Sequence, residues 1–166
     1  MTLKWNRFNP SRWTVMWMLL RGDLNTIIVD EREYMDDRMQ NRIRFSLAHE
    51  FGHYILHSGL VRDFHFEDVE EWVEFMHRVP EEQHKWFEFH AHEFAGRLLV
   101  PLEMLTTEFN KWIVKAERSG FRQWDKFGDA MKEHIADRIA RIFGVSQQVI
   151  EKRLIREGLW PLKILK

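Results

Sequence analysis

Residues 42–57 read RIRFSLAHEFGHYILH, and the rest of the chain can be interpreted outward from them. Within this stretch apolar residues recur at four-residue steps from Ile43 to Ile55, which is the spacing of one face of an α-helix. Gly59, just beyond the last of these residues, is a typical helix stop. The pattern therefore predicts an amphipathic helix over residues 41–58.

The same helix carries the motif His-Glu-Phe-Gly-His at residues 49–53. Positions i and i+4 lie one turn apart on one face, so His49 and His53 can present their ring nitrogens to a single metal ion. Glu50 lies beside this pair. Zinc lowers the pKa of a bound water toward ~7, and a nearby carboxylate can accept the proton as that water attacks a carbonyl. The motif therefore predicts a hydrolytic zinc centre with Glu50 as general base.

A catalytic zinc is held by three protein ligands, so one more must come from elsewhere in the chain. In the segment that follows the motif, Glu88, Ala91 and Ala95 share one helical face. Two alanines on that face would let this helix approach another closely and deliver the carboxylate to the ion. We therefore choose Glu88 as the third ligand, with His92 and Glu93 as the alternatives.

Other polar side chains near the motif could support the site without being metal ligands. His57 lies eight residues from His49, which is ~12 Å along a helix, so one ion can hardly bind both. We expect His57 to support the site or the fold. Amide hydrolysis also needs a group that stabilises charge on the carbonyl oxygen. Tyr54, His90, His92 and several arginines are candidates, and the sequence does not rank them.

Composition narrows the class of protein. The 166 residues carry a formal charge of −1 and contain no cysteine. The lack of cysteine excludes disulfide bonds, thiolate catalysis, Fe–S clusters and cysteine-type zinc sites, and the length indicates one domain spanning residues 1–166. The apolar run at residues 13–20 is shorter than the ~20 residues that a membrane helix needs. We expect a cytoplasmic protein without membrane contact.

The remaining elements predict an α+β fold that is mostly helical around a small N-terminal β-sheet. Residues 13–20 and 26–30 flank a glycine-containing turn and are expected to form a β-hairpin. Two C-terminal helices, at residues 132–143 and 147–156, are predicted to form a helix-turn-helix, with Ser146 as the N-cap of the second. Further helices are expected at residues 67–79, 82–100 and 101–118. Within the single domain we place a zinc-binding core at 1–120 and a C-terminal helical subregion at 121–160.

Three stretches together resemble a known family, the ImmA/IrrE zinc metallo-endopeptidases. These are residues 42–57, the segment Glu88-x-x-Ala-x-x-Phe-Ala-x-x-Leu-Leu-Val-Pro101, and the segment Ala140-x-x-Phe-Gly-Val-Ser-x-x-Val-Ile-x-x-Arg-Leu154. The resemblance implies that Zn²⁺ is the cofactor and that the fold is a zincin-like, gluzincin domain. Carried over by position, it implies the zinc ligands His49, His53 and Glu88 and the general base Glu50.

The resemblance also implies a substrate class. Members of that family cleave repressor proteins of the helix-turn-helix type and so release phage, mobile-element or stress genes, and we expect such a repressor to be encoded nearby. Two features depart from the family pattern. His92 stands where Asn is usual, and residues 61–87 form a long acidic, aromatic insertion, which suggests a distinct element that contacts substrate.

A function of another class is a DNA-binding regulator that uses the C-terminal helices, with a structural or sensory metal site. Residues 111–166 carry 13 basic and seven acidic residues, a net charge of +6. Lys152, Arg153 and Arg156 would supply contacts to phosphates, and binding to duplex DNA would then weaken with salt. An αα-hairpin that closes the domain core is the other interpretation of the same segment.

Overall fold

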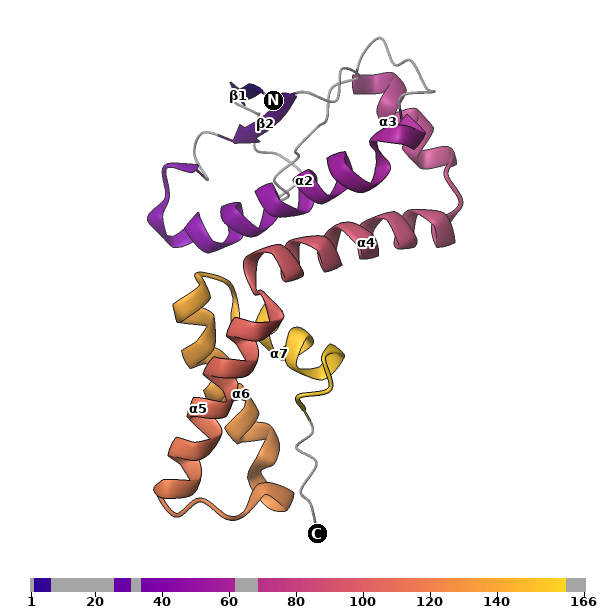
Figure 1. Cartoon of the computed structure of the whole chain (residues 1–166). Helices are drawn as coiled ribbons and strands as arrows, with labels where there is room; N and C mark the ends of the chain where they lie inside the picture. The colour runs from indigo at the N-terminus through magenta and orange to yellow at the C-terminus, as the bar shows by residue number, and fades with distance from the viewer. Residues whose placement is uncertain (1, 7–25, 31–33, 62–68, 161–166) are drawn as a thin grey trace. The chain divides into compact units, whose positions relative to one another are not determined.

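The chain folds mostly into helices, as the computed structural model in Figure 1 shows. The structure describes residues 2–6, 26–30, 34–61 and 69–160. Its elements, in chain order, are β1 (Thr2–Asn6), β2 (Thr26–Asp30), the 3₁₀ turn η1 (Asp37–Met39), α2 (Gln40–Val61), α3 (Val69–Arg78), α4 (Glu81–Leu99), α5 (Leu102–Arg118), α6 (Trp124–Phe143) and α7 (Gln147–Arg156).

The prediction of an α+β fold with a small N-terminal β-sheet is wrong. The first strand of the expected hairpin, residues 13–20, lies outside the described residues. Thr26–Asp30 does form β2, but it pairs with β1, and the two run parallel, with Thr2 opposite Thr26. A tight turn joins only antiparallel strands, so a hairpin does not account for this pairing. Apart from these two five-residue strands, the elements of the described residues are helices.

The helices form where they are predicted, with two main differences in length. The helix expected over residues 41–58 does not stop at Gly59 but continues to Val61. Prolines separate the helices as expected, and α4 ends at Leu99, two residues before Pro101, because a proline disfavours helical backbone in the residue before it. The predicted helix at residues 132–143 is longer in the structure, where α6 begins at Trp124. Trp124 and Met131 pack against the same hydrophobic core as the rest of α6, so the buried face of the helix extends to its first residue.

The chain divides into two compact units, Met1–Ala95 and Gly96–Lys166. The division falls within α4, so this helix contributes its first part to unit 1 and its last turn to unit 2. The zinc-binding core expected at 1–120 and the C-terminal helical subregion expected at 121–160 remain predictions. That all 166 residues act as one metallopeptidase domain stays a prediction.

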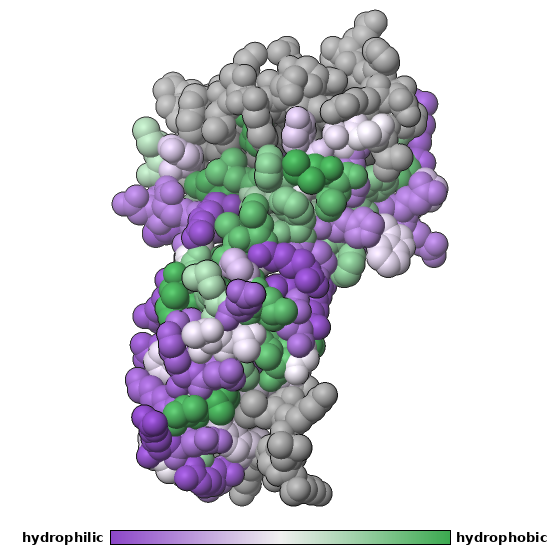
Figure 2. Space-filling model, in the orientation of Figure 1, coloured by the Kyte–Doolittle hydropathy of each residue, from purple (hydrophilic) through white to green (hydrophobic). Residues whose placement is uncertain are grey.

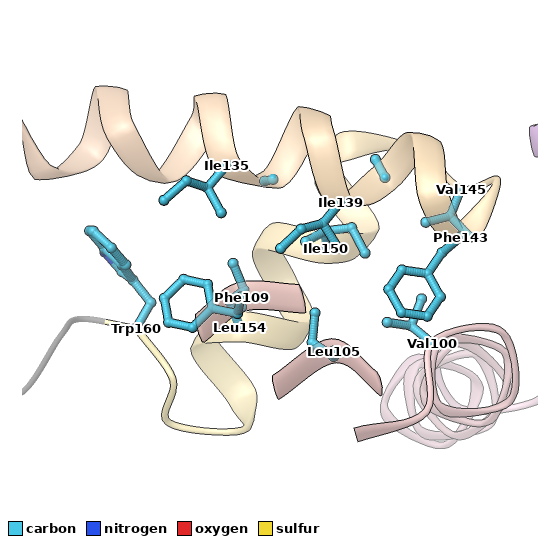
Figure 3. Packing of buried hydrophobic residues seen from close by; sticks show 12 residues of the cluster. Val100, Leu105, Phe109, Ile135, Ile139, Phe143, Val145, Ile150, Leu154 and Trp160 are labelled. Atoms are coloured by element: carbon cyan, nitrogen blue, oxygen red, sulfur yellow. The ribbon is translucent and has the colours of Figure 1, made fainter. Parts of the chain in front are cut away.

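Unit 2 has a well-defined hydrophobic core, shown close up in Figure 3. Leu105 and Phe109 of α5 meet Ile135 and Ile139 of α6, and all four side chains are almost completely buried. The chain turns from α6 into α7 at Gly144, whose φ of 61° is a left-handed conformation that glycine adopts without strain. The α7 helix then completes this core, so the C-terminal pair is part of the packed unit.

A buried arginine joins two segments of unit 2. The Arg153 side chain is only 3% exposed, and its guanidinium forms an ion pair with Glu157 and donates a hydrogen bond to the carbonyl oxygen of Val100 at 3.3 Å. A buried charge of this kind needs its partners, since an unpaired one is strongly destabilising. Arg153 is therefore occupied within the fold and is not available for contacts to DNA phosphates.

On the face seen in Figure 2, hydrophilic side chains lie over much of unit 2, with hydrophobic ones among them. Within the described residues, none of the helices combines the length and the apolar character needed to cross a lipid bilayer.

The core of unit 2 predicts a contrast between two leucines of α5. Leu105 is fully buried, whereas Leu102 is 42% exposed. We expect Leu105→Ala to lower the free energy of unfolding by about 2–5 kcal/mol, because it leaves a cavity in the core. Leu102→Ala is the matched control and should change stability by less than about 1 kcal/mol. Chemical denaturation measures both, and equal effects would contradict the assignment of this core.

Candidate metal centre

Helices α2 and α4 approach each other closely at Gly52. A Cβ atom on Gly52 would lie 3.1 Å from the Cβ of Phe94 and 3.2 Å from the Cα of Ala91, which is tighter than ordinary van der Waals contact. Ala91 and Ala95, on the facing side of α4, are completely buried. Small residues on both helices therefore permit a short distance between the backbones, as the alanine spacing on α4 predicts.

This contact brings three of the predicted ligands together. His49 Nε2 lies 3.1 Å from His53 Nε2. Glu88 reaches across from α4, with one carboxylate oxygen 3.3 Å from His49 Nε2 and the other 3.4 Å from His53 Nε2. Ligand atoms held at about 2.0–2.1 Å around a tetrahedral zinc are separated by about 3.3 Å. The two imidazole nitrogens and the Glu88 carboxylate therefore lie close enough together to share one metal ion.

His92 borders the same site. Donor atoms of His49, Glu88 and His92 lie within 4.8 Å of one another, so these three residues could also hold a metal ion. The His92 ring is exposed and packs edge-on against the His49 ring, with 4.5 Å between the centroids. Its Nδ1 lies 3.2 Å from the backbone oxygen of Glu88. Glu93, the other alternative, does not belong to this group of donors.

The two acidic side chains of the site have opposite electrostatic environments. The pKa of Glu88 is held well below its usual range, because the rings of His49 and His53 hydrogen-bond to its carboxylate. Burial, together with the negative charge of Glu88, raises the pKa of Glu50 to about 8. Glu88 is therefore suited to bind a cation, and Glu50 is suited to hold a proton.

A divalent cation bound at the site would lower the pKa of both carboxyl groups. Positive charge beside a carboxylate favours its ionised form and lowers its pKa. A cation held by Glu88 and the two histidines would therefore lower the pKa of Glu50 from about 8 toward neutrality. A general base works best when its pKa lies near the operating pH, so metal binding would prepare Glu50 for that role.

His57 extends the site away from the carboxylates. Its Nδ1 lies 3.0 Å from Nδ1 of His53, and its side chain is buried. Burial, followed by the charges of His53 and His90, lowers the pKa of His57 to about 4. The sequence analysis compared His57 only with His49 and missed this contact. The spacing of four residues between His53 and His57 is the signal that could have revealed it.

The two remaining candidates lie beside other aromatic side chains. Tyr54 stacks on Phe51, with ring centroids 6.2 Å apart. His90 is exposed and lies 5.9 Å from the His57 ring and 5.5 Å from the Trp86 ring. The structure assigns neither of them a contact with the three clustered donors.

A comparison with protein families identifies the chain. The model of the peptidase family M78, described as the IrrE N-terminal-like domain, matches residues 34–155. The chain belongs to this family. Membership confirms the resemblance to ImmA/IrrE proteins and indicates a metallopeptidase-like function. No curated protein matches the chain, and no solved structure does.

The helix contact predicts different outcomes for two glycines of α2. Gly52→Ala adds a methyl group that has no room, so we expect it to push α2 and α4 apart and to weaken metal binding. Gly59→Ala is the matched control, since nothing lies within 4 Å of a Cβ at that position. It should leave metal affinity unchanged and raise stability by up to about 1 kcal/mol through helix propensity. Zinc titration and thermal unfolding check both, and equal zinc affinities would contradict the role of this contact.

The ligand assignment predicts the metal content of three variants with changes in α4. We expect Glu88→Ala to raise the dissociation constant for zinc by more than the 10–100-fold that is typical when a group outside the ligand set is changed. Glu82→Ala removes an exposed carboxylate of the same helix and should have no effect. His92→Ala tests the alternative ligand. Zinc binding by the purified proteins, measured against a chelator, would contradict the assignment if His92→Ala lost zinc and Glu88→Ala kept it.

Proposed function

We propose that this protein is a zinc-dependent endopeptidase that cleaves a protein inside the cytoplasm. The observation that carries the proposal is the cluster of His49, His53 and Glu88 donors at 3.1–3.4 Å, with Glu50 next in sequence to one of them. Two imidazoles and one carboxylate are a typical ligand set of catalytic zinc, and they leave a position for water or substrate. Membership of a peptidase family supports the same reaction class.

The proposed mechanism divides the work between the two carboxylates. Zinc, when bound, supplies a Lewis acid that polarises the scissile carbonyl and acidifies the attacking water. Glu88 completes the ligand set, and its low pKa keeps it ionised over the physiological range. Glu50 accepts the proton from the attacking water and donates it to the leaving nitrogen, so that the carbon–nitrogen bond can break.

For the substrate we propose a helix-turn-helix transcriptional repressor of phage, mobile-element or stress genes. The support is the family membership together with charge. Residues 62–93 carry ten acidic and three basic residues, a net charge of −7. Repressors that bind DNA present basic surfaces to the phosphates, and opposite charge on two partners accelerates their encounter. We expect the repressor gene to lie beside the gene for this protein.

The DNA-binding alternative has one observation in its favour and two against it. The net charge of +6 over residues 111–166 favours it. However, Arg153 is buried and paired, which leaves only Lys152 and Arg156 exposed among the three basic residues expected to contact DNA. The second C-terminal helix also contributes Ile150 and Leu154 to the core of unit 2. We therefore favour the αα-hairpin interpretation of this segment.

The peptidase proposal predicts that Glu50→Gln separates metal binding from catalysis. The variant keeps the size of the side chain but cannot accept a proton. We expect it to bind zinc as the unmodified protein does. Cleavage of the co-encoded repressor should be about 10²–10⁴-fold slower, which is the usual contribution of a general base. Electrophoresis of the repressor over time measures the rate.

Two controls accompany that experiment. Removal of zinc from the unmodified protein with a chelator should stop cleavage, and addition of zinc should restore it. A Glu50→Gln variant that cleaves at the original rate would overturn the mechanism. If the repressor stays intact with the zinc-loaded unmodified protein, the proposed substrate is wrong.

A further inference from the structure

We propose that His57 is a positioning residue for the metal centre, which accepts a hydrogen bond from Nδ1–H of His53 and thereby directs the Nε2 lone pair of His53 toward the metal ion. The inference rests on the proposed metal centre. It concerns how one ligand is oriented, and it assigns a defined role to a buried histidine outside the ligand set.

Both ring nitrogens of His53 have close neighbours. Nε2 faces the site, 3.1 Å from His49 Nε2 and 3.4 Å from a Glu88 oxygen. Nδ1 faces the other way and lies 3.0 Å from Nδ1 of His57. That distance is typical of a hydrogen bond between two nitrogens, and the contact joins successive turns of one helix.

Only one of the two facing Nδ1 atoms can carry the shared proton. If it sits on His57, a neutral His53 carries its own proton on Nε2, and that nitrogen has no lone pair for a metal. If it sits on His53, a neutral His53 has a lone pair on Nε2, and a metal ion can take the place of the proton through which Nε2 hydrogen-bonds to Glu88 in the metal-free protein. In metal sites the second nitrogen of a ligating histidine almost always donates to an acceptor, which fixes the tautomer and the ring orientation. Here the acceptor is the imidazole of His57.

The surroundings of His57 hold its ring in place. The side chain is only 6% exposed, so water cannot readily replace it as an acceptor. The Phe87 ring packs edge-on against it at 4.5 Å, and the His90 ring lies nearly parallel at 5.9 Å. Nε2 of His57 is buried without a hydrogen-bond partner in the described part of the chain. A buried polar atom without a partner is costly, which argues against a purely structural reason for a histidine here.

The Nδ1 atoms of the two imidazole ligands differ in their hydrogen-bond partners. Nδ1 of His49 is buried and has no hydrogen-bond partner within the residues that the structure describes. His53 is thus the histidine whose orientation a side chain controls, through a residue of its own helix. The effect of changing His57 should therefore reach the metal through His53.

A matched pair of variants tests the proposal. Asn and Leu have nearly the same shape, and the Oδ1 atom of Asn takes a place in the side chain close to that of Nδ1 in His. We expect His57→Leu to raise the dissociation constant for zinc by about 10–100-fold, the usual effect of losing such a partner. His57→Asn should keep the dissociation constant within about threefold of the original value. Competition with a chromophoric chelator measures all three proteins without any substrate.

Two results would overturn the proposal. One is a zinc affinity of His57→Leu equal to that of the unmodified protein. The other is an equal loss in the Asn and Leu variants, which would show that the ring packing matters and the acceptor does not. Thermal unfolding of the metal-free variants shows whether either one is misfolded.

A measurement on the unmodified protein decides the matter even if the variants do not fold. In ¹⁵N spectra of the zinc-loaded protein, the ring nitrogens of His53 report which of them carries a proton. The proposal predicts a protonated Nδ1 and a metal-bound Nε2, and a proton on Nε2 would refute it. Because neither experiment involves cleavage, failure to find a peptidase substrate would leave this test valid.

Discussion

The site depends on the close contact between α2 and α4 at Gly52. Two histidines from one helix can supply only two ligands, and the third must come from a neighbouring backbone at short distance. The absence of a side chain on Gly52, against Ala91 and Phe94, permits that distance. Glu88 lies one turn before Ala91 and so meets His49 and His53 at 3.3 and 3.4 Å. The packing of these two helices therefore determines whether the carboxylate of α4 can reach the histidines of α2.

Chemically similar side chains of the site lie in different environments, and their pKa values and hydrogen-bond partners differ. Glu50 and Glu88 carry the same functional group, but burial raises the pKa of one to about 8 and two imidazoles lower that of the other. The histidines divide in the same way, since His53 has an imidazole beside its Nδ1 and His49 does not have such a partner in the described residues. Differences in environment thus give chemically similar side chains different acid–base and hydrogen-bonding properties.

The sequence predicted the helices and the clustered residues well, because both follow from local spacing. The i, i+4 relation of His49 and His53 and the alanine face of α4 need no knowledge of the tertiary fold. The strand pairing could not be obtained in this way. Thr26–Asp30 is rich in β-branched residues, as strands often are. Its partner Thr2–Asn6, however, is distant in sequence and parallel, and a parallel partner leaves no turn motif between the strands. The burial of Arg153 was missed for a similar reason, since Val100, whose carbonyl oxygen accepts its hydrogen bond, is 53 residues away in the sequence.

The most direct test of the central claim is a crystal structure of the zinc-loaded protein with anomalous diffraction measured at the zinc absorption edge. The account predicts one strong anomalous peak per chain, with His49 Nε2, His53 Nε2 and a Glu88 oxygen each about 2.0–2.2 Å from it. A zinc ion bound by His92 in place of His53, or a peak away from Glu88, would contradict it.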